Sequence, residues 1–321
     1  MTARLSLIVK ILASVALIFL VLPRLNIDSV KSVLLDRNML YAIIGSVVIL
    51  FVQSLLAAVR QQYVVAMFGQ RVGFLQSLNI WMAGLFLSQV LITFVAGDIA
   101  RVVKLTRSGM RRRVAAQVIM LDRMIGLLTL LGMVVIVTPV TYELADSSPV
   151  LQMSLLLLSA ASAAGLAGAV GLGIFNRNDR LSSMKLMQNR IFSIATDLVS
   201  IVRMMFSHGG SSLAIVALSA LMHLLNVVAM IFIARSAGIV ASVAEMAVLL
   251  MPIMLLMILP ISFAGWGVRE AATVAGFGLL GIASGPSFAV SVAFGLSLVL
   301  TSLPGAFGVF WKTNMEAHPT A

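Results

Sequence analysis

The sequence predicts an all-α, polytopic integral membrane protein in which one domain, residues 1–321, contains about seven to nine membrane segments. The composition supports this: 61% of the residues are hydrophobic and 10% are charged, whereas soluble chains are roughly 45–50% apolar and about 25% charged. Uncharged runs of about 20 residues, the length that a spanning helix needs, recur along the chain. The 22 Lys and Arg lie mostly in short segments between these runs, as the positive-inside bias predicts.

The same observations exclude several classes of function. The longest hydrophilic stretch, residues 176–190, is too short to fold as a catalytic domain. The chain has no cysteine, so it forms no disulfide and no Cys-bound metal site, and its three histidines are too far apart in sequence to suggest a ligand cluster. No phosphate-binding G-x-x-x-x-G-K-[ST] loop is present. We therefore expect no cofactor, no metal and no nucleic-acid partner, and transport without ATP.

The membrane segments are expected in the following order. Residues 5–22 are an apolar run without a small-residue cleavage site, so we interpret them as a retained first helix rather than a signal peptide. Residues 39–59 are an uncharged span. Further spans are expected at residues 124–142, 149–175 and 209–234 and, in up to three passes, at residues 246–311. Within residues 246–311 the only charged residues are Arg269 and Glu270.

Residues 72–97 are interpreted as a re-entrant hairpin. Arg60 and Arg71 precede this run and the basic segment 101–113 follows it, and both flanks have the charge typical of cytoplasmic loops. Two flanks on the same side require an even number of crossings, which about 26 residues cannot provide as full spans. The alternative is an ordinary span with Arg60 and Arg71 outside.

Residues 186–206 predict an amphipathic helix, because apolar residues recur alternately four and three positions apart on one face. We expect this helix to lie at the membrane interface or to pack on the helix bundle. The alternative is a helix that binds a partner protein.

Two short motifs resemble each other, one in each of two candidate half-repeats, residues 39–142 and 209–311. Each has a glycine that interrupts an apolar run, an arginine four residues later and a nearby carboxylate: Gly97, Asp98 and Arg101 in the first, and Gly265, Arg269 and Glu270 in the second. Transporters built from internal repeats have their binding sites at such interrupted segments. An inverted repeat would place Arg101 and Arg269 at opposite faces, whereas a parallel repeat would not.

These residue types suit an anionic ligand. Glycine leaves backbone N–H groups accessible, and a helix that begins there points its positive end at the break. Arginine adds a permanent charge and a fork of donors that matches phosphate. The predicted substrate-binding residues are Arg101, Arg269, Glu270, Asp98, Gly265, Trp266, Gly267 and Arg123. Among them, Arg101 and Arg269 would contact a lipid phosphate. Asp98 and Glu270 would orient the arginines or release the lipid by competing for them.

A purely structural interpretation of these residues is also open. Asp98 and Arg101, or Arg269 and Glu270, could simply neutralise each other at helix ends. Arg123 could extend its long side chain to the cytoplasmic surface.

The longest of the motifs resembles a known family. Residues 259–271, with the sequence LPISFAGWGVREA, closely resemble the hallmark of the lysylphosphatidylglycerol synthase transmembrane-region family, also called flippase-like. Gly97-Asp98-x-x-Arg101 and Asp122-Arg123-x-x-Gly126-Leu127 are similar to earlier motifs of that family. The resemblance covers roughly residues 97–311. It implies a helical membrane domain that moves lipids, either aminoacylated phosphatidylglycerol or polyprenyl-linked saccharides, without the soluble synthase domain and its enzymatic activity.

We therefore predict a lipid flippase or lipid transport factor in the cell (inner) membrane of a bacterium, with a cytoplasmic N-terminus. Its expected ligands are membrane lipids with anionic headgroups, and a separate lipid-modifying enzyme or glycosyltransferase is a candidate partner. One alternative is a membrane-embedded transferase that uses a polyprenyl-linked sugar, which would need carboxylates able to bind a metal or to act as a base. The other is a non-transporting accessory subunit of a lipid-modifying enzyme.

Overall fold

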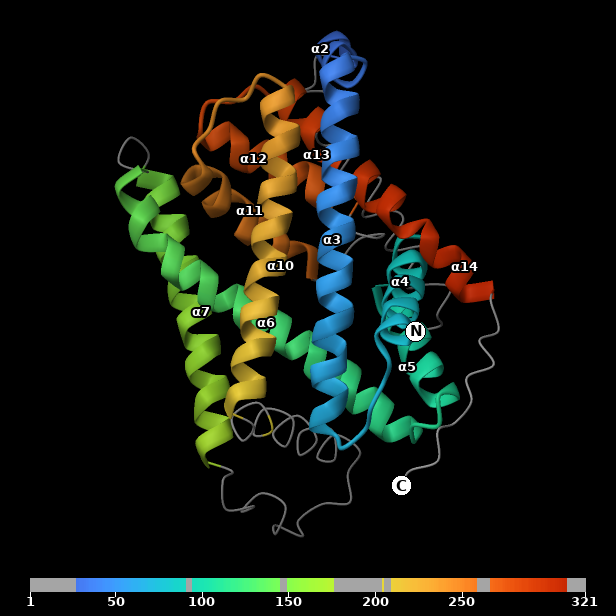
Figure 1. Cartoon of the computed structure of the whole chain (residues 1–321). Helices are drawn as coiled ribbons and strands as arrows, with labels where there is room; N and C mark the ends of the chain where they lie inside the picture. Colours follow the sequence, from blue (N-terminus) through green and yellow to red (C-terminus); the bar gives the residue numbers. More distant parts are fainter. Residues whose placement is uncertain are drawn as a thin grey trace, which may run out of the picture.

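The computed structural model describes residues 27–90, 94–144, 149–175, 204, 209–258 and 266–310, and these residues are mainly helical (Figure 1). The helices are α2 (Ile27–Leu34), α3 (Arg37–Met67), α4 (Phe74–Val90), α5 (Phe94–Arg107), α6 (Arg112–Leu144), α7 (Pro149–Phe175), α10 (Gly209–Ser236), α11 (Val243–Ile258), α12 (Val268–Leu279), α13 (Ser284–Ser302) and α14 (Pro304–Phe310). Five helices in the described part of the chain are long and apolar enough to cross a membrane. The all-α, polytopic class is confirmed.

Most of the predicted spans correspond to one helix each. Helix α7 coincides with the predicted segment 149–175, and α6 and α10 contain the segments predicted at 124–142 and 209–234. The predicted first helix at residues 5–22 and all of the amphipathic segment 186–206 except Met204 lie outside the described residues.

Helix α3 is longer than the predicted span because the uncharged sequence continues after Arg60. The helix begins at Arg37, where the side chain of Asp36 accepts a hydrogen bond of 2.6 Å from the backbone N–H of Asn38. It ends only at Met67. Arg60 therefore lies inside the helix, where the residue is 5% exposed, rather than in a loop.

Helices α3 and α10 form a long antiparallel pair in the middle of the molecule (Figure 1). At one end Ser236 Oγ donates to Met39 Sδ, and further along Ser46 Oγ donates to Ala229 O at 3.0 Å. In the other half of the pair, Arg60 Nη1 donates to Ser219 Oγ at 3.0 Å. The two helices thus provide a continuous support on which the shorter helices pack.

The segment predicted as a hairpin, residues 72–97, contains α4 and only the first turn of α5, and most of α5 lies in the segment interpreted as a cytoplasmic loop, residues 101–113. The observed hairpin is therefore longer than predicted. Helix α4 packs against α5 and against the C-terminal half of α3, and α5 packs against α6 (Figure 1). Ser77 Oγ of α4 donates to Ala58 O of α3 at 2.7 Å. The two arms approach most closely at Gly84 and Gly97, where a Cβ atom on Gly97 would lie 2.4 Å from Gly84 O. Only residues without side chains allow this approach. Helix α5 begins at Phe94, so Gly97 lies inside the helix and provides close packing rather than the chain break.

A second pair of short helices, α11 and α12, lies toward the opposite end of the α3–α10 pair (Figure 1). This end has its own apolar core, which joins Met39 of α3 and Ala234 of α10 to Met246 of α11 and Phe277 of α12. The α4–α5 end has a separate core that includes Val64, Ile80, Leu105 and Ile215. The two helical hairpins are therefore attached to opposite ends of the same support.

Helices α13 and α14 connect the two ends. Helix α13 packs along α12 and α3, and α14 crosses α4 so closely that a Cβ atom on Gly305 would lie 2.0 Å from Met82 O. Lys104 of α5 donates from Nζ to Asn79 Oδ1 and to Gly308 O, both at 2.7 Å. Helix α14 is thus attached to the first hairpin.

Candidate functional site

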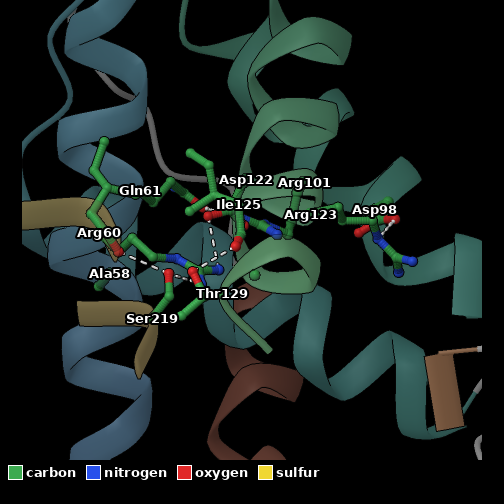
Figure 2. A network of polar contacts seen from close by, with 12 residues as sticks. Ala58, Arg60, Gln61, Asp98, Arg101, Asp122, Arg123, Ile125, Thr129 and Ser219 are labelled. Carbon is green, nitrogen blue, oxygen red and sulfur yellow. Dashed lines mark hydrogen bonds and ion pairs between the residues drawn. The ribbon is translucent and has the colours of Figure 1, made fainter. Parts of the chain in front are cut away.

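Six buried or half-buried side chains from five helices form a polar cluster beside the first hairpin, which we call the double-arginine cluster: Arg60 and Gln61 of α3, Trp81 of α4, Arg101 of α5, Asp122 of α6 and Ser219 of α10. Figure 2 labels all of these residues except Trp81. Arg101 Nη2 donates to Asp122 Oδ2 at 2.9 Å and to Gln61 Oε1 at 2.9 Å. Arg60 Nη2 forms a buried ion pair with Asp122 Oδ1 at 2.8 Å. One carboxylate is therefore shared by two guanidinium groups.

The position of Arg101 depends on a glycine of the opposite hairpin arm. A Cβ atom on Gly84 would lie 2.6 Å from Arg101 Cγ, so the arginine stem passes over the bare backbone of α4. The guanidinium then lies with its Cζ atom 4.7 Å from the centre of the Trp81 ring, while Arg60 Cζ lies 5.9 Å from the same ring. Both distances are within the range of cation–π attraction. Trp81 therefore stabilises both cations from one side.

The double-arginine cluster has unmatched charge and unmatched donors. Two guanidinium groups face one carboxylate, so the cluster carries one excess positive charge. Three buried N–H groups in it have no hydrogen-bond partner among the described residues: Arg60 Nε, Gln61 Nε2 and Trp81 Nε1. Each buried donor without a partner destabilises a protein by about 1–3 kcal/mol. The cluster is thus complementary to a negatively charged group with several acceptor atoms.

The second predicted motif forms a different arrangement at the start of α12. Arg269 and Glu270 are each 1% exposed, and Arg269 donates to Glu270 Oε1 from Nη2 at 2.6 Å and from Nε at 3.0 Å. Ser291 of α13 contacts both residues at 3.3 Å. Trp266 covers the guanidinium, with Arg269 Cζ 4.5 Å from the ring centre. Here one cation meets one anion, and the charges cancel.

Two glycines position this second pair. Gly267 has φ of 84°, a conformation that favours glycine, and its backbone N–H donates to Glu270 Oε2 at 2.5 Å at the start of α12. Gly295 of α13 provides the space for the guanidinium, because a Cβ atom there would lie 2.1 Å from Arg269 Nη2. Gly265, which sequence analysis placed at the break, lies outside the described residues.

Asp98 and Arg123, both predicted site residues, pair with each other and lie apart from Asp122 (Figure 2). The expectation that Asp98 orients Arg101 does not match the observed pairing, since Arg101 pairs with Asp122 of the neighbouring helix. Asp98 and Arg123 instead line an outer groove between α5 and α6 with a volume of about 680 Å³. Arg107 and Arg112 lie in the same groove, so its charge is mainly positive.

A central cavity of about 270 Å³ lies between the two hairpins. Its lining includes Trp81 and Ser88 from the first hairpin, Met254 and Met257 from the second, and His223 from α10. His223 Nε2 lies 3.0 Å from Gly126 O, so the ring links α10 to α6. Polar groups from α3, α4 and α10 thus face apolar groups from α11 and α13 across one cavity, and Trp81 joins the cavity to the double-arginine cluster.

Comparison with known protein families identifies the family to which this chain belongs. The family model described as the lysylphosphatidylglycerol synthase TM region matches residues 7–305. The chain belongs to this family. No curated protein matches it, and no solved structure matches it.

Membership of the lysylphosphatidylglycerol synthase TM-region family associates the chain with membrane lipids, since the family is defined on the membrane region of those synthases. It is an integral membrane protein, as its apolar helices also indicate. In the described segments no three His, Asp or Glu side chains lie close enough together to hold a metal ion.

The main residue that sequence analysis missed is Arg60, which was interpreted as a loop charge. A usable signal existed: Arg60 is flanked by the uncharged runs 39–59 and 61–70, the same context that drew attention to Arg269. For Asp122 the sequence indicates a charged position at the start of the predicted span 124–142 and a family motif, but not its pairing with Arg60 and Arg101. Gln61 and Trp81 carry no sequence signal, because isolated Gln and Trp residues are ordinary in membrane helices.

Proposed function

We propose that this protein moves a lipid with an anionic headgroup across the membrane, as a flippase or lipid transport factor. The observation that carries the proposal is the pair of helical hairpins at opposite ends of the α3–α10 pair, each with a buried arginine and carboxylate near it and with a shared cavity between them. Buried charge inside a membrane is unfavourable and marks pathways for polar groups. Family membership independently favours a lipid as the ligand.

In this proposal the two hairpins are re-entrant and enter from opposite sides. Helices α4 and α5, with 17 and 14 residues, are shorter than the roughly 20 residues of a spanning helix. The segments at the open end of the first hairpin are basic, with Arg71 before α4 and Arg111 after α5. By the positive-inside rule this end faces the cytoplasm. The same rule supports a cytoplasmic N-terminus in the cell (inner) membrane of a bacterium.

The volume of the cavity determines which part of a lipid could enter it. Its 270 Å³ is below the roughly 300–1,000 Å³ of pockets that enclose drug-sized ligands. It accommodates a headgroup, while the acyl chains stay in the surrounding bilayer. Aminoacylated phosphatidylglycerol and polyprenyl phosphate-linked saccharides both have this form. A partner enzyme that modifies the lipid on one side would provide the substrate.

A reconstitution experiment tests transport. Purified protein in vesicles that contain fluorescent phosphatidylglycerol is exposed to a membrane-impermeant quencher, and the protected fraction of the fluorescence is measured. In empty vesicles about half of the label is protected, because half of the lipid lies in the inner leaflet. With the protein we expect that fraction to disappear over time.

The variants Arg101→Gln and Arg60→Gln should slow this loss about tenfold or more, because each removes charge from the cluster that borders the cavity. Arg37→Gln, an exposed arginine at the far end of α3, is the matched control and should transport normally. If the wild-type protein protects as much label as empty vesicles do, the transport proposal fails. Sugar transfer from a polyprenyl-linked donor would instead favour the transferase.

A further inference from the structure

We infer that the double-arginine cluster is a binding site for a phosphate-class oxyanion, with Arg60 and Arg101 as the cationic ligands. This inference gives the proposed transport its headgroup site and rests on that proposal for the lipid origin of the anion. Arg60, Gln61 and Trp81, which belong to none of the sequence motifs, contribute to this site.

The first reason is the uncompensated charge. Within the described part of the chain, Asp122 is the one acidic side chain that pairs with Arg60 or Arg101. Asp98 is nearby but pairs with Arg123. The charges of Asp98 and Arg123 cancel each other, so the excess positive charge of the cluster stays the same when these two residues are counted with it. Arg60 and Arg101 are each 5% exposed, so water and salt screen them poorly. A bound anion would restore electroneutrality.

The second reason is the set of unpartnered donors. Gln61 is fully buried, and its Oε1 atom accepts from both Nε and Nη2 of Arg101, which fixes the orientation of the amide. Its Nε2 atom is consequently left as a donor without a partner, together with Arg60 Nε and Trp81 Nε1. An acceptor with several oxygens and a negative charge satisfies donors of this kind, and guanidinium groups match phosphate geometry.

The third reason is access. The Trp81 side chain lies over both guanidinium groups and also lines the central cavity. Trp81 is thus the side chain that both lines the cavity and contacts the arginines, and an anion would pass its edge to reach them. Because Asp122 is shared by two cations, an anion can replace it at one arginine while it stays paired with the other.

The Arg269–Glu270 pair provides an internal comparison. There one guanidinium meets one carboxylate, Ser291 bonds to both, and Trp266 covers the cation. No charge remains uncompensated in that pair. The structure thus assigns anion binding to the first hairpin and a neutral ion pair to the second, although sequence analysis treated the two arginines alike.

The test measures thermal unfolding of the purified full-length chain in detergent at constant ionic strength. Three probes are titrated: inorganic phosphate, short-chain phosphatidylglycerol, and dioctanoylglycerol, which has no phosphate. We expect saturable stabilisation by at least one phosphate-bearing probe and none by dioctanoylglycerol. A shift with phosphatidylglycerol alone identifies a lipid headgroup, and a shift with both phosphate-bearing probes identifies a general oxyanion site; both outcomes support the inference.

The decisive variant is Gln61→Glu, which places the missing negative charge inside the cluster with little change of shape. We expect it to raise the melting temperature without anion and to weaken the affinity for the phosphate-bearing probe about tenfold or more. Gln70→Glu, the same substitution at an exposed position near the same end, is the control and should leave anion binding unchanged. Should Gln61→Glu fail to fold, Trp81→Phe removes one donor, retains a smaller aromatic ring and should weaken binding several-fold.

Two results would overturn the inference: no stabilisation of the wild-type protein by either phosphate-bearing probe, or unchanged anion affinity in the folded Gln61→Glu or Trp81→Phe variant. Because binding is measured without vesicles, its outcome is separate from that of the transport assay. A protein that binds the anion and moves no lipid would contradict the proposed function and leave the anion site intact.

Discussion

Arg101 pairs with Asp122, which lies on the next helix, and not with Asp98, which lies three residues before it in the same helix. The distance from Arg101 Nη2 to Asp122 Oδ2 is 2.9 Å, and the same carboxylate lies 2.8 Å from Arg60. Asp122 thereby joins three helices, α3, α5 and α6. Asp98 faces the outer groove and pairs with Arg123, whose side chain is 43% exposed.

This relationship predicts unequal effects of two identical substitutions. Asp122→Asn leaves two buried guanidinium groups without a counter-charge, and breaking a buried ion pair in this way costs about 3–5 kcal/mol of unfolding free energy. Asp98→Asn breaks a partly exposed pair worth about 0–1 kcal/mol. Unfolding in mixtures of mild detergent and sodium dodecyl sulfate measures both. Equal losses for the two variants would show that Asp122 does not stabilise the cluster as described.

The Arg269–Glu270 pair predicts a compensating double substitution. Arg269→Met or Glu270→Gln alone leaves one buried charge unpaired and should lower the unfolding free energy by about 3–5 kcal/mol. The double variant removes both charges, so its loss should be smaller than the sum of the single losses. The same unfolding measurement on all four proteins completes the cycle. Additive losses would mean that the two side chains contribute independently.

The crossing of α4 and α5 predicts a steric effect at Gly97. In Gly97→Ala the new Cβ atom meets the backbone oxygen of Gly84 at 2.4 Å, so the hairpin arms must separate. Such overpacking costs about 1–3 kcal/mol. Gly132→Ala in α6 is the matched control: its Cβ atom would have no neighbour within 4 Å, and alanine favours the helix. A Gly97→Ala protein as stable as Gly132→Ala would contradict the close packing.

The opposite placement of the hairpins predicts a labelling pattern. The chain has no cysteine, so single cysteines introduced at exposed positions report without background. Gln70 and Arg111 flank the first hairpin, and Val240 and Ala283 flank the second. With an impermeant thiol reagent added to intact cells and to inverted vesicles, the first two should react from one side and the last two from the other. All four reacting from the same side would rule out hairpins that enter from opposite faces.

The fold class and most helix positions follow from sequence because they depend on local composition. The uncharged runs that became α7 and α10 are long enough to define spans by themselves. The basic flanks of residues 72–97 predict a hairpin but not its bounds, because α5 continues to Arg107, in the segment interpreted as a loop. The Arg269–Glu270 contact is also predictable, since the two residues are adjacent in the chain. These features require no knowledge of tertiary packing.

The double-arginine cluster could not be derived in this way. Its members come from positions 60, 61, 81, 101, 122 and 219, and their meeting depends on how five helices pack. The pairing of Arg101 is a particular example: Asp98 is closer in sequence, but the close approach of the hairpin arms at Gly84 directs the arginine stem inward. Glycine at position 84 looks in the sequence like any other small residue of a membrane helix.

The bonds of Lys104 have a consequence for biosynthesis. Its Nζ atom donates to the backbone oxygen of Gly308, which is 204 residues further along the chain. During translation α4 and α5 therefore leave the ribosome long before the helix that completes their polar contacts has been made. The first hairpin must wait, with the Lys104 ammonium group satisfied by water or by lipid headgroups, until α14 is inserted. Assembly of the first hairpin is thus completed only after α14 has been synthesised.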